Sequence, residues 1–240
     1  MKSPLAIVTG AAKRVGKHLA LSLAEKGYDL LIHYHSSAEQ AEAVAQEIRD
    51  LGQNAITVPA NLQQPFEAAQ TLFFHAKQLG AVELLINNAS VFETGTLAET
   101  TPESFQHHQR VNLEAPLFLS QQFALQLPEN TPGQIINLLD WRAATPPTGH
   151  LSYTLSKSGL RSLTQILAQE LSPQIRVNGV VLGAILPPEG VGEEYQQRLN
   201  SNVPMQTHGS VDDVWNAVEF LLNSNFANGS LVEITGGEHL

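Results

Sequence analysis

Short apolar runs alternate with amphipathic segments along the chain. The segments at 15–27 and 37–52 have helical spacing and end at glycines, which is typical of helix C-termini. The apolar runs lie at 5–9 (LAIVT), 30–34 (LLIHY), 55–60 (AITVPA), 83–87 (ELLIN), 134–139 (QIINLL), 176–182 (RVNGVVL) and 230–235 (SLVEIT). Strands that are apolar on both faces and separated by helices predict a parallel sheet covered on both sides. We therefore predict an α/β fold with a single Rossmann-type doubly wound parallel sheet of seven strands flanked by helices.

Nothing in the hydrophobic pattern divides the 240 residues into separate domains. We find neither an internal repeat nor a linker, and one α/β domain of this length is ordinary, so residues 1–240 are predicted to form a single domain. The least regular stretch is 183–200 (GAILPPEGVGEEYQQRLN). We interpret it as a loop near a site, and we expect the substrate loop around 183–208.

Composition narrows the classes of function. The 23 acidic and 13 basic residues give a formal charge of −10, which argues against a nucleic-acid partner or an anionic membrane surface. The chain has no cysteine, so neither disulfides nor thiolate metal sites are expected. The opening MKSPLAIVTG has too short an apolar run for a signal peptide, and no run approaches the roughly 20 apolar residues of a membrane span. We expect a cytoplasmic protein.

The stretch TGAAKRVG at 9–16 joins the first predicted strand to the first helix. Doubly wound sheets bind dinucleotides at such a turn, because glycines allow close backbone approach and a helix N-terminus faces the pyrophosphate. The second strand runs into HYHSS without the Asp or Glu that accepts hydrogen bonds from an unmodified ribose. Side chains able to donate to a 2′-phosphate are Lys13, Arg14, His35, Ser36 and Ser37. They predict NADPH, with a solvated surface as the alternative.

The stretch YTLSK places Tyr153 and Lys157 four residues apart on a predicted helix. Both side chains therefore project from one face. An ammonium beside a tyrosine favours the phenolate and brings proton transfer within range of neutral pH. The pair alone occurs by chance in many helices, but together with the nucleotide turn it indicates an oxidoreductase.

These motifs resemble the short-chain dehydrogenase/reductase family over essentially the whole length. The matching elements are Thr9, Gly10 and Gly16 in the turn, NNA at 87–89, Asn112 in RVN, the Tyr153 and Lys157 pair, and RVNGV at 176–180. The resemblance implies hydride transfer and a homotetramer or homodimer formed through the long fourth and fifth helices. It makes Tyr153 the proton donor, Lys157 the group that holds the nicotinamide ribose and tunes the tyrosine, and Asn112 the keeper of a water relay.

The same resemblance implies a set of cofactor-binding residues along the edge of the sheet. The expected set is Gly10, Lys13, Arg14, Val15, Gly16, His33, His35, Ser36, Ser37, Asn61, Leu62, Asn88, Ala89, Ser90, Tyr153, Lys157 and Gly183.

Three departures from the usual family pattern resemble the pteridine reductase branch and the related dihydromonapterin reductases. The chain has Arg14 where a glycine is usual, Ser90 where NNAG is common, and Asp140 thirteen residues before the tyrosine where a serine is usual. The resemblance implies that the substrate contacts Arg14, Ser90, Phe92, Asp140 and Tyr153, with Phe92 stacked on the pterin. Ser36, Asn61 and LGA at 182–184 depart from the branch pattern too.

The chemistry of Asp140 also favours a pterin. An ionised carboxylate only accepts hydrogen bonds and repels a ketone oxygen, whereas a reduced pterin presents N–H groups and needs a proton at a ring nitrogen. We therefore predict NADPH-dependent reduction of a dihydropterin or dihydrofolate to the tetrahydro form, with proton delivery through Tyr153 and Asp140.

Two other functions stay open at this point. One is a carbonyl reductase of the 3-oxoacyl or sugar-alcohol type, and the other is a non-catalytic NADP(H)-sensing protein. The histidine pairs His33 with His35 and His107 with His108 lack a carboxylate spacing that completes a metal site, so no metal is expected. Trp141 either lines the pocket or fills the core.

Overall fold

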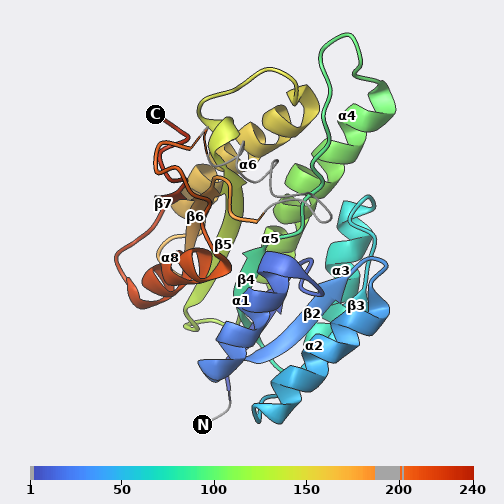
Figure 1. Ribbon diagram of the computed structural model, residues 1–240. Helices are drawn as coiled ribbons and strands as arrows, with labels where there is room; N and C mark the ends of the chain where they lie inside the picture. The colour runs from blue at the N-terminus through green and yellow to red at the C-terminus, as the bar shows by residue number, and fades with distance from the viewer. Residues whose placement is uncertain (1–2, 187–200, 202) are drawn as a thin grey trace.

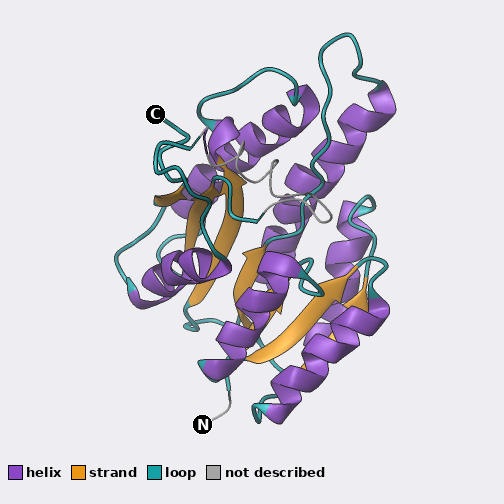
Figure 2. Cartoon of the chain, viewed as in Figure 1, coloured by secondary structure: helices purple, strands orange, loops and turns teal. Residues whose placement is uncertain are grey.

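The computed structural model describes residues 3–186, 201 and 203–240. Within this part of the chain a seven-stranded parallel sheet has the strand order β3-β2-β1-β4-β5-β6-β7. Figure 2 shows the strands of the sheet in orange between the helices. The strands are β1 Leu5–Val8, β2 Asp29–Tyr34, β3 Ala55–Pro59, β4 Val82–Asn87, β5 Gly133–Asp140, β6 Ile175–Leu182 and β7 Leu231–Ile234. The predicted fold class is confirmed, and each predicted strand is found within two residues of its expected bounds.

Helices cover both faces of the sheet (Figure 1). They are α1 Arg14–Glu25, α2 Ala38–Asp50, α3 Pro65–Ala76, α4 Pro102–Gln109, α5 Ala115–Gln126, α6 Leu151–Glu170 and α8 Val211–Asn223. Buried residues of α1, α2 and α8 form one apolar cluster with the sheet, while those of α3, α5 and α6 form a second cluster. No helix in the described ranges is both long and apolar enough to cross a membrane.

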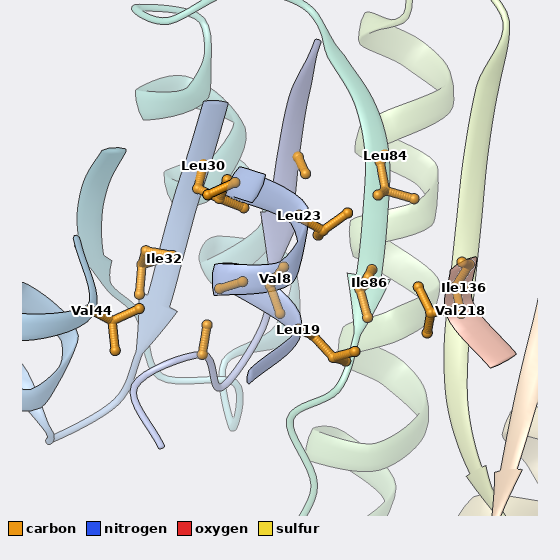
Figure 3. Close-up of a cluster of buried hydrophobic side chains, with 14 of the residues drawn as sticks. Val8, Leu19, Leu23, Leu30, Ile32, Val44, Leu84, Ile86, Ile136 and Val218 are labelled. Carbon is orange, nitrogen blue, oxygen red and sulfur yellow. The ribbon is translucent and has the colours of Figure 1, made fainter. Parts of the chain in front are cut away.

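The buried strand β1 shows why the sheet needs two helical layers. Successive side chains of a strand point to opposite faces, and in β1 Ala6 and Val8 join the first cluster while Leu5 and Ile7 join the second. Figure 3 shows part of the first cluster, where Val8 lies among side chains of α1 and the neighbouring strands. Full burial of one such aliphatic side chain contributes about 1.5–3 kcal/mol.

The strand order places the predicted site. The chain runs outward from β1 through β2 to β3, returns to β4 on the other side of β1, and continues to β7. The carboxyl ends of parallel strands meet at one edge of the sheet, and ligands bind where the order reverses. The turn after β1 and the segments after β4, β5 and β6 therefore converge there.

Two parts of the fold differ from the sequence-based expectations or lie beyond them. A π-helical turn, Arg110–Glu114, joins α4 to α5 and holds Asn112 in a position that periodicity did not predict. Of the substrate loop predicted around 183–208, residues 187–200 and 202 lie outside the described part of the chain.

Candidate active site

The turn between β1 and α1 is held in a conformation that brings helix and strand into direct contact. Gly10 has φ of 64° and Arg14 has φ of 53°, a left-handed conformation that is unfavourable for a residue with a side chain. A Cβ atom at position 16 would overlap the carbonyl oxygen of Gly10, so only glycine fits where α1 meets the turn. Backbone strain of this kind gathers at ligand sites.

His33 supports this turn from the end of β2. Its Nδ1 accepts the Gly10 N–H at 3.0 Å, and its Nε2 lies 3.1 Å from the carbonyl oxygen of Ala60, to which it donates. Burial lowers the pKa of His33 to about 4, so the ring is neutral at physiological pH. Both ring nitrogens are therefore used inside the protein. The sequence placed His33 among the cofactor ligands; in the structure its side chain is buried and both ring nitrogens have partners within the protein.

Residues 35–37, between β2 and α2, offer donors and no carboxylate, and the nearest acidic side chain in the described sequence that follows is Glu39 in the first turn of α2. His35 and Ser36 are exposed, and Ser37 precedes α2. Exposed Lys13 precedes α1, whose first turn contains no acidic residue. Partial positive charge at the start of a helix and free cationic or hydroxyl donors suit an anion. These residues fit a dinucleotide that carries a 2′-phosphate.

Thr9 ties the segment after β4 to the turn. Its hydroxyl oxygen accepts the N–H groups of Asn88 and Ala89 at 2.9 and 3.0 Å, and the Asn88 amide donates to the Thr9 carbonyl at 2.7 Å. Leu62 is buried beside Ala89, and the side chain of Asn61 accepts the backbone N–H of residue 63 at 3.0 Å. The predicted residues after β1, β3 and β4 are thus joined in one framework.

The central contact of the site joins Tyr153 to Asp140. The Tyr153 hydroxyl donates to Oδ2 of Asp140 at 2.8 Å. Burial raises the pKa of Tyr153 well above its ordinary value, the charge of Asp140 and this hydrogen bond raise it further, and Arg142 and Ser90 oppose the rise. Tyr153 is therefore a protonated phenol at neutral pH. The two groups meet because Asp140 is the last residue of β5 and Tyr153 lies in the first turn of α6, which packs next to the end of that strand.

Lys157 lies one turn of α6 beyond the tyrosine, with its ammonium nitrogen 5.9 Å from the centre of the Tyr153 ring. Its Nζ donates to the carbonyl oxygen of Leu138 at 2.8 Å. Burial lowers the pKa of Lys157 to about 8, and the charge of Asp140 opposes this shift. The expected lowering of the Tyr153 pKa by the ammonium is wrong in this structure, because burial and then the Asp140 carboxylate raise that pKa.

Asn112 is fully buried and uses its whole side-chain amide. It donates to the carbonyl of Val91 at 2.9 Å and to the hydroxyl of Ser156 at 3.0 Å. Its oxygen accepts from Val91 N–H at 2.9 Å and from the Ser90 hydroxyl at 3.1 Å. Asn112 therefore fixes the segment that carries Ser90 and Phe92. The water relay implied by the family stays a prediction.

Phe92 lies beside the tyrosine. Its ring meets Tyr153 edge-on with centroids 4.7 Å apart, and it stacks on His150 at 4.7 Å with an interplanar angle of 19°. The ring of Phe92 is exposed. Trp141, whose place the sequence left open, packs against a small buried cluster beneath the site.

Three side chains near the site were missed in the sequence. Arg142 pairs with Asp140, His150 stacks on Phe92, and Glu238 accepts the N–H of Ala184 at 2.6 Å. Of the three, only Arg142 could have been suggested by the sequence, because it lies two residues after Asp140 in DWR. The other two come from the loop before α6 and the end of the chain, where periodicity gives no direction.

One cavity of about 230 Å³ brings together eight of the predicted site residues. Its lining includes Arg14, Val15, Asn88, Ser90, Asp140, Tyr153, Lys157 and Gly183. Phe92 and Asn112 are not part of the lining, although Phe92 contacts Tyr153 and Asn112 is hydrogen-bonded to Ser90. A larger cavity of about 510 Å³ lies between α8, β7 and the segment at 205–209, away from Tyr153. Among the described residues, no group of three or more His, Asp or Glu side chains is placed to hold a metal ion.

A sequence model for short chain dehydrogenases matches residues 4–198. The chain belongs to the short-chain dehydrogenase/reductase family. This short-chain dehydrogenase is 29% identical over 240 residues to 3-oxoacyl-(acyl-carrier-protein) reductase FabG of Staphylococcus aureus, with 98% of each chain covered.

Two solved structures resemble this short-chain dehydrogenase throughout. FolM alternative dihydrofolate reductase 1 from Brucella canis, complexed with NADP, has a TM-score of 0.87 and 32% identity, covering 98% of this chain and 94% of that one. A blue fluorescent protein from a metagenomic library, in complex with NADPH, has a TM-score of 0.92 and 28% identity, covering 100% and 99%.

Proposed function

We propose that this oxidoreductase uses NADPH to reduce a dihydropterin or dihydrofolate to the tetrahydro form, and that it belongs to the pteridine reductase branch. The observation that carries the proposal is the 2.8 Å hydrogen bond between Tyr153 and Asp140 at the cavity. A carboxylate there suits a substrate with N–H groups better than a bare ketone oxygen. The likeness to the FolM dihydrofolate reductase adds support.

The residues around the turn fit the cofactor. Gly10, Gly16 and the start of α1 would receive the pyrophosphate, and Lys13, His35, Ser36 and Ser37 would donate to the 2′-phosphate. Arg14, also expected to bind the 2′-phosphate, instead lines the cavity that contains Tyr153. When bound, NADPH supplies the hydride. The solved neighbours that contain NADP and NADPH support this choice of cofactor.

The protein's own part in the reaction is proton supply. A tyrosine phenol is protonated at neutral pH, and burial and Asp140 raise the pKa of Tyr153 further, so the group carries a proton for a substrate atom that gains electron density. Lys157, with a pKa of about 8, is mostly an ammonium at pH 7 and adds positive charge beside the reacting atoms. Asp140 holds the phenol in place and accepts N–H groups of the substrate.

The walls of the site fit a flat heterocycle. Ser90 offers a hydroxyl, and the guanidinium of Arg14 reaches across the cavity to the carbonyl oxygen of Leu186 at 3.2 Å. Phe92 lies outside the lining of this cavity, but its exposed ring meets Tyr153 edge-on, and a bound pterin that extends past Tyr153 would stack on it.

A second candidate is the reduction of a 3-oxoacyl thioester, favoured by the full-length likeness to FabG. Asp140 weighs against it, since a carboxylate next to the tyrosine repels the developing oxyanion of a ketone. A sugar-alcohol reductase meets the same objection. The presence of both Tyr153 and Lys157 weighs against a non-catalytic NADP(H) sensor.

We also propose a cytoplasmic homotetramer or homodimer that binds neither nucleic acid nor membrane. Exposed apolar side chains on α5, Leu117 and Leu125, support an interface along that helix. Light scattering gives the mass directly.

A substrate panel tests the proposed function. Purified protein is mixed with NADPH or NADH and with dihydropterins, dihydrofolate, quinonoid dihydropterin, a 3-oxoacyl thioester and simple ketones, and cofactor oxidation is followed by absorbance. We expect turnover of a dihydropterin or dihydrofolate with NADPH. Turnover of the thioester or ketones alone would replace the proposal with the second candidate, and no turnover at all would favour the sensor.

A further inference from the structure

Arg142 is the side chain most closely engaged with Asp140. It lies in a single 3-10 turn, Trp141–Ala143, that begins where β5 ends. The Arg142 backbone N–H donates to Oδ1 of Asp140 at 2.8 Å, and its Nη1 lies 3.1 Å from Oδ1 and 3.2 Å from Oδ2. Both side chains are largely removed from solvent, with 22% and 13% exposed. A pair at this depth is screened less than a surface ion pair.

These contacts fix the carboxylate oxygen that faces the tyrosine. Arg142 reaches both oxygens of Asp140, while Tyr153 donates to Oδ2 alone. Contacts from Arg142 to both oxygens restrict rotation of the carboxylate, so Oδ2 stays directed at the Tyr153 hydroxyl. Arg142 therefore sets the orientation of the group that holds the phenol.

The same guanidinium also touches the aromatic wall. Its central carbon lies 5.4 Å from the centre of the Phe92 ring and 4.8 Å from that of Trp141. Cation–π contacts at such distances are favourable and are stronger when partly desolvated. Arg142 thus links the carboxylate to the ring that flanks Tyr153.

A second carboxylate faces Arg142 from the C-terminal segment. Glu238 accepts the Ala184 N–H, burial raises the pKa of Glu238, and the charge of Arg142 lowers it while that of Asp140 raises it. The charge of Arg142 therefore acts on a second carboxylate besides the one that it contacts directly. Its removal would leave two like charges without compensation.

We propose that Arg142 is a positioning residue for proton transfer, acting through Asp140 to hold the hydroxyl of Tyr153 in its donating geometry. The proposal rests on the proposed reductase chemistry at Tyr153, whichever substrate is reduced. In this role Arg142 acts through Asp140 and does not itself bind substrate or cofactor.

A double-mutant cycle between positions 140 and 142 tests the proposal. The variants are Arg142→Met, Arg142→Lys, Asp140→Asn and Asp140→Asn with Arg142→Met, assayed on the substrate that the wild type turns over best. Arg49→Met is the matched control, because Arg49 also pairs with an acidic side chain, Glu42, at 2.7 Å but lies on α2 away from the cavity.

We expect Arg142→Met to lower kcat by about 10- to 100-fold with the NADPH Kd changed by less than about twofold. Arg142→Lys should recover part of the loss, since it restores charge without the planar fork. In the Asp140→Asn background, Arg142→Met should change kcat by less than about twofold. An equal loss in both backgrounds, or a kcat as unaffected as in Arg49→Met, would overturn the proposal.

Denaturant unfolding of the cofactor-free protein gives a readout that needs no turnover. The shifts in midpoint caused by Asp140→Asn and Arg142→Met should be non-additive, because the two side chains share one contact. Additive shifts would show that the pair is not coupled and would overturn the proposal. If the wild type reduces a thioester instead of a dihydropterin, only the pterin assignment fails, and the kinetic cycle is measured on the thioester.

Discussion

The Tyr153 hydroxyl donates a hydrogen bond to Oδ2 of Asp140 at 2.8 Å, which joins the start of α6 to the end of β5. In this geometry the carboxylate stabilises the neutral phenol, because a nearby negative charge disfavours a second one. The neighbouring Lys157 holds the Leu138 carbonyl instead of the tyrosine oxygen. The site is therefore arranged to keep a proton on Tyr153 until a substrate takes it.

Replacing Asp140 by serine should separate pterin reduction from ketone reduction. Asp140→Ser removes the carboxylate that accepts substrate N–H groups and restores a hydroxyl donor. We expect dihydropterin turnover to fall by about 10- to 1000-fold. The NADPH Kd, measured by cofactor fluorescence, should change little. Improved ketone turnover without a loss on dihydropterins would contradict the role given to Asp140.

Phe92→Ala is the contrasting variant for that experiment. It removes an aromatic wall and leaves the proton donor in place, so about 0.5–1.5 kcal/mol of stacking, plus buried area, should be lost from pterin binding. The loss should appear mainly as a higher KM. A fall in kcat with unchanged KM would instead place Phe92 in the alignment of Tyr153.

Tyr153→Phe tests whether this phenol is the proton source. The ring is kept and only the hydroxyl is removed, so the cofactor turn is untouched. We expect kcat to fall by about 100-fold or more. The NADPH Kd, determined by calorimetry, should stay close to that of the wild type. Near-normal turnover would place the acid elsewhere in the cavity.

The alkaline limb of the pH profile should report Lys157. Burial lowers the pKa of Lys157 to about 8, so its ammonium is present below that pH and is lost as the pH rises through it. Tyr153 keeps its proton to much higher pH. We expect kcat/KM for NADPH in the free enzyme to decline around pH 8. Lys157→Arg, which stays charged, should move the decline upward, and an unmoved decline would assign it to another group.

His33 should make stability depend on pH. Its pKa is lowered from 6.5 to about 4 in the folded protein, so between these values the unfolded chain binds a proton that the folded chain does not. Stability should therefore fall as the pH drops from about 6.5 to about 4, by about 1.4 kcal/mol for each pKa unit at most. Urea unfolding at pH 5 and pH 7 measures this difference.

His33→Phe is the matched variant for that measurement. It keeps a planar ring but leaves the Gly10 N–H without its acceptor, which should cost about 1–3 kcal/mol at pH 7. The component of the pH dependence due to His33 should disappear. A pH dependence identical to the wild type would mean that other groups carry it.

Much of the framework was predictable because it follows from periodicity. The apolar run at 5–9 has to be buried on both faces, so β1 lies at the centre of a two-sided sheet. The contact between Asp140 and Tyr153 was also predictable, because the end of β5 and the start of α6 both lie at the carboxyl edge of the sheet. The spacing of Tyr153 and Lys157 predicted a lowered pKa for Tyr153, whereas burial and Asp140 raise it. Spacing along a helix shows neither how deeply a side chain is buried nor which other charges lie beside it.

The parts that were not predicted depend on side-chain direction. Arg142 turns back onto Asp140 only because β5 ends in a tight 3-10 turn. Glu238 reaches Ala184 because the C-terminal segment folds over the end of β6, a long-range contact without local signal. The sequence predicts His33 as a cofactor ligand, but its ring nitrogens are hydrogen-bonded to Gly10 and Ala60 and hold the turn after β1.

Arg14→Gly tests the strained residue of the cofactor turn. Arg14 has φ of 53°, a conformation that costs about 1–2 kcal/mol with a side chain and little for glycine. The greater freedom of glycine in the unfolded chain opposes this gain by about 0.4–1 kcal/mol, so stability should change by no more than about 1 kcal/mol.

Binding should change more in Arg14→Gly, because the guanidinium that lines the cavity and reaches Leu186 is lost. We expect a higher KM for NADPH or for the pterin with the melting temperature nearly unchanged. Unchanged KM values for both would show that this charge in the turn serves neither ligand.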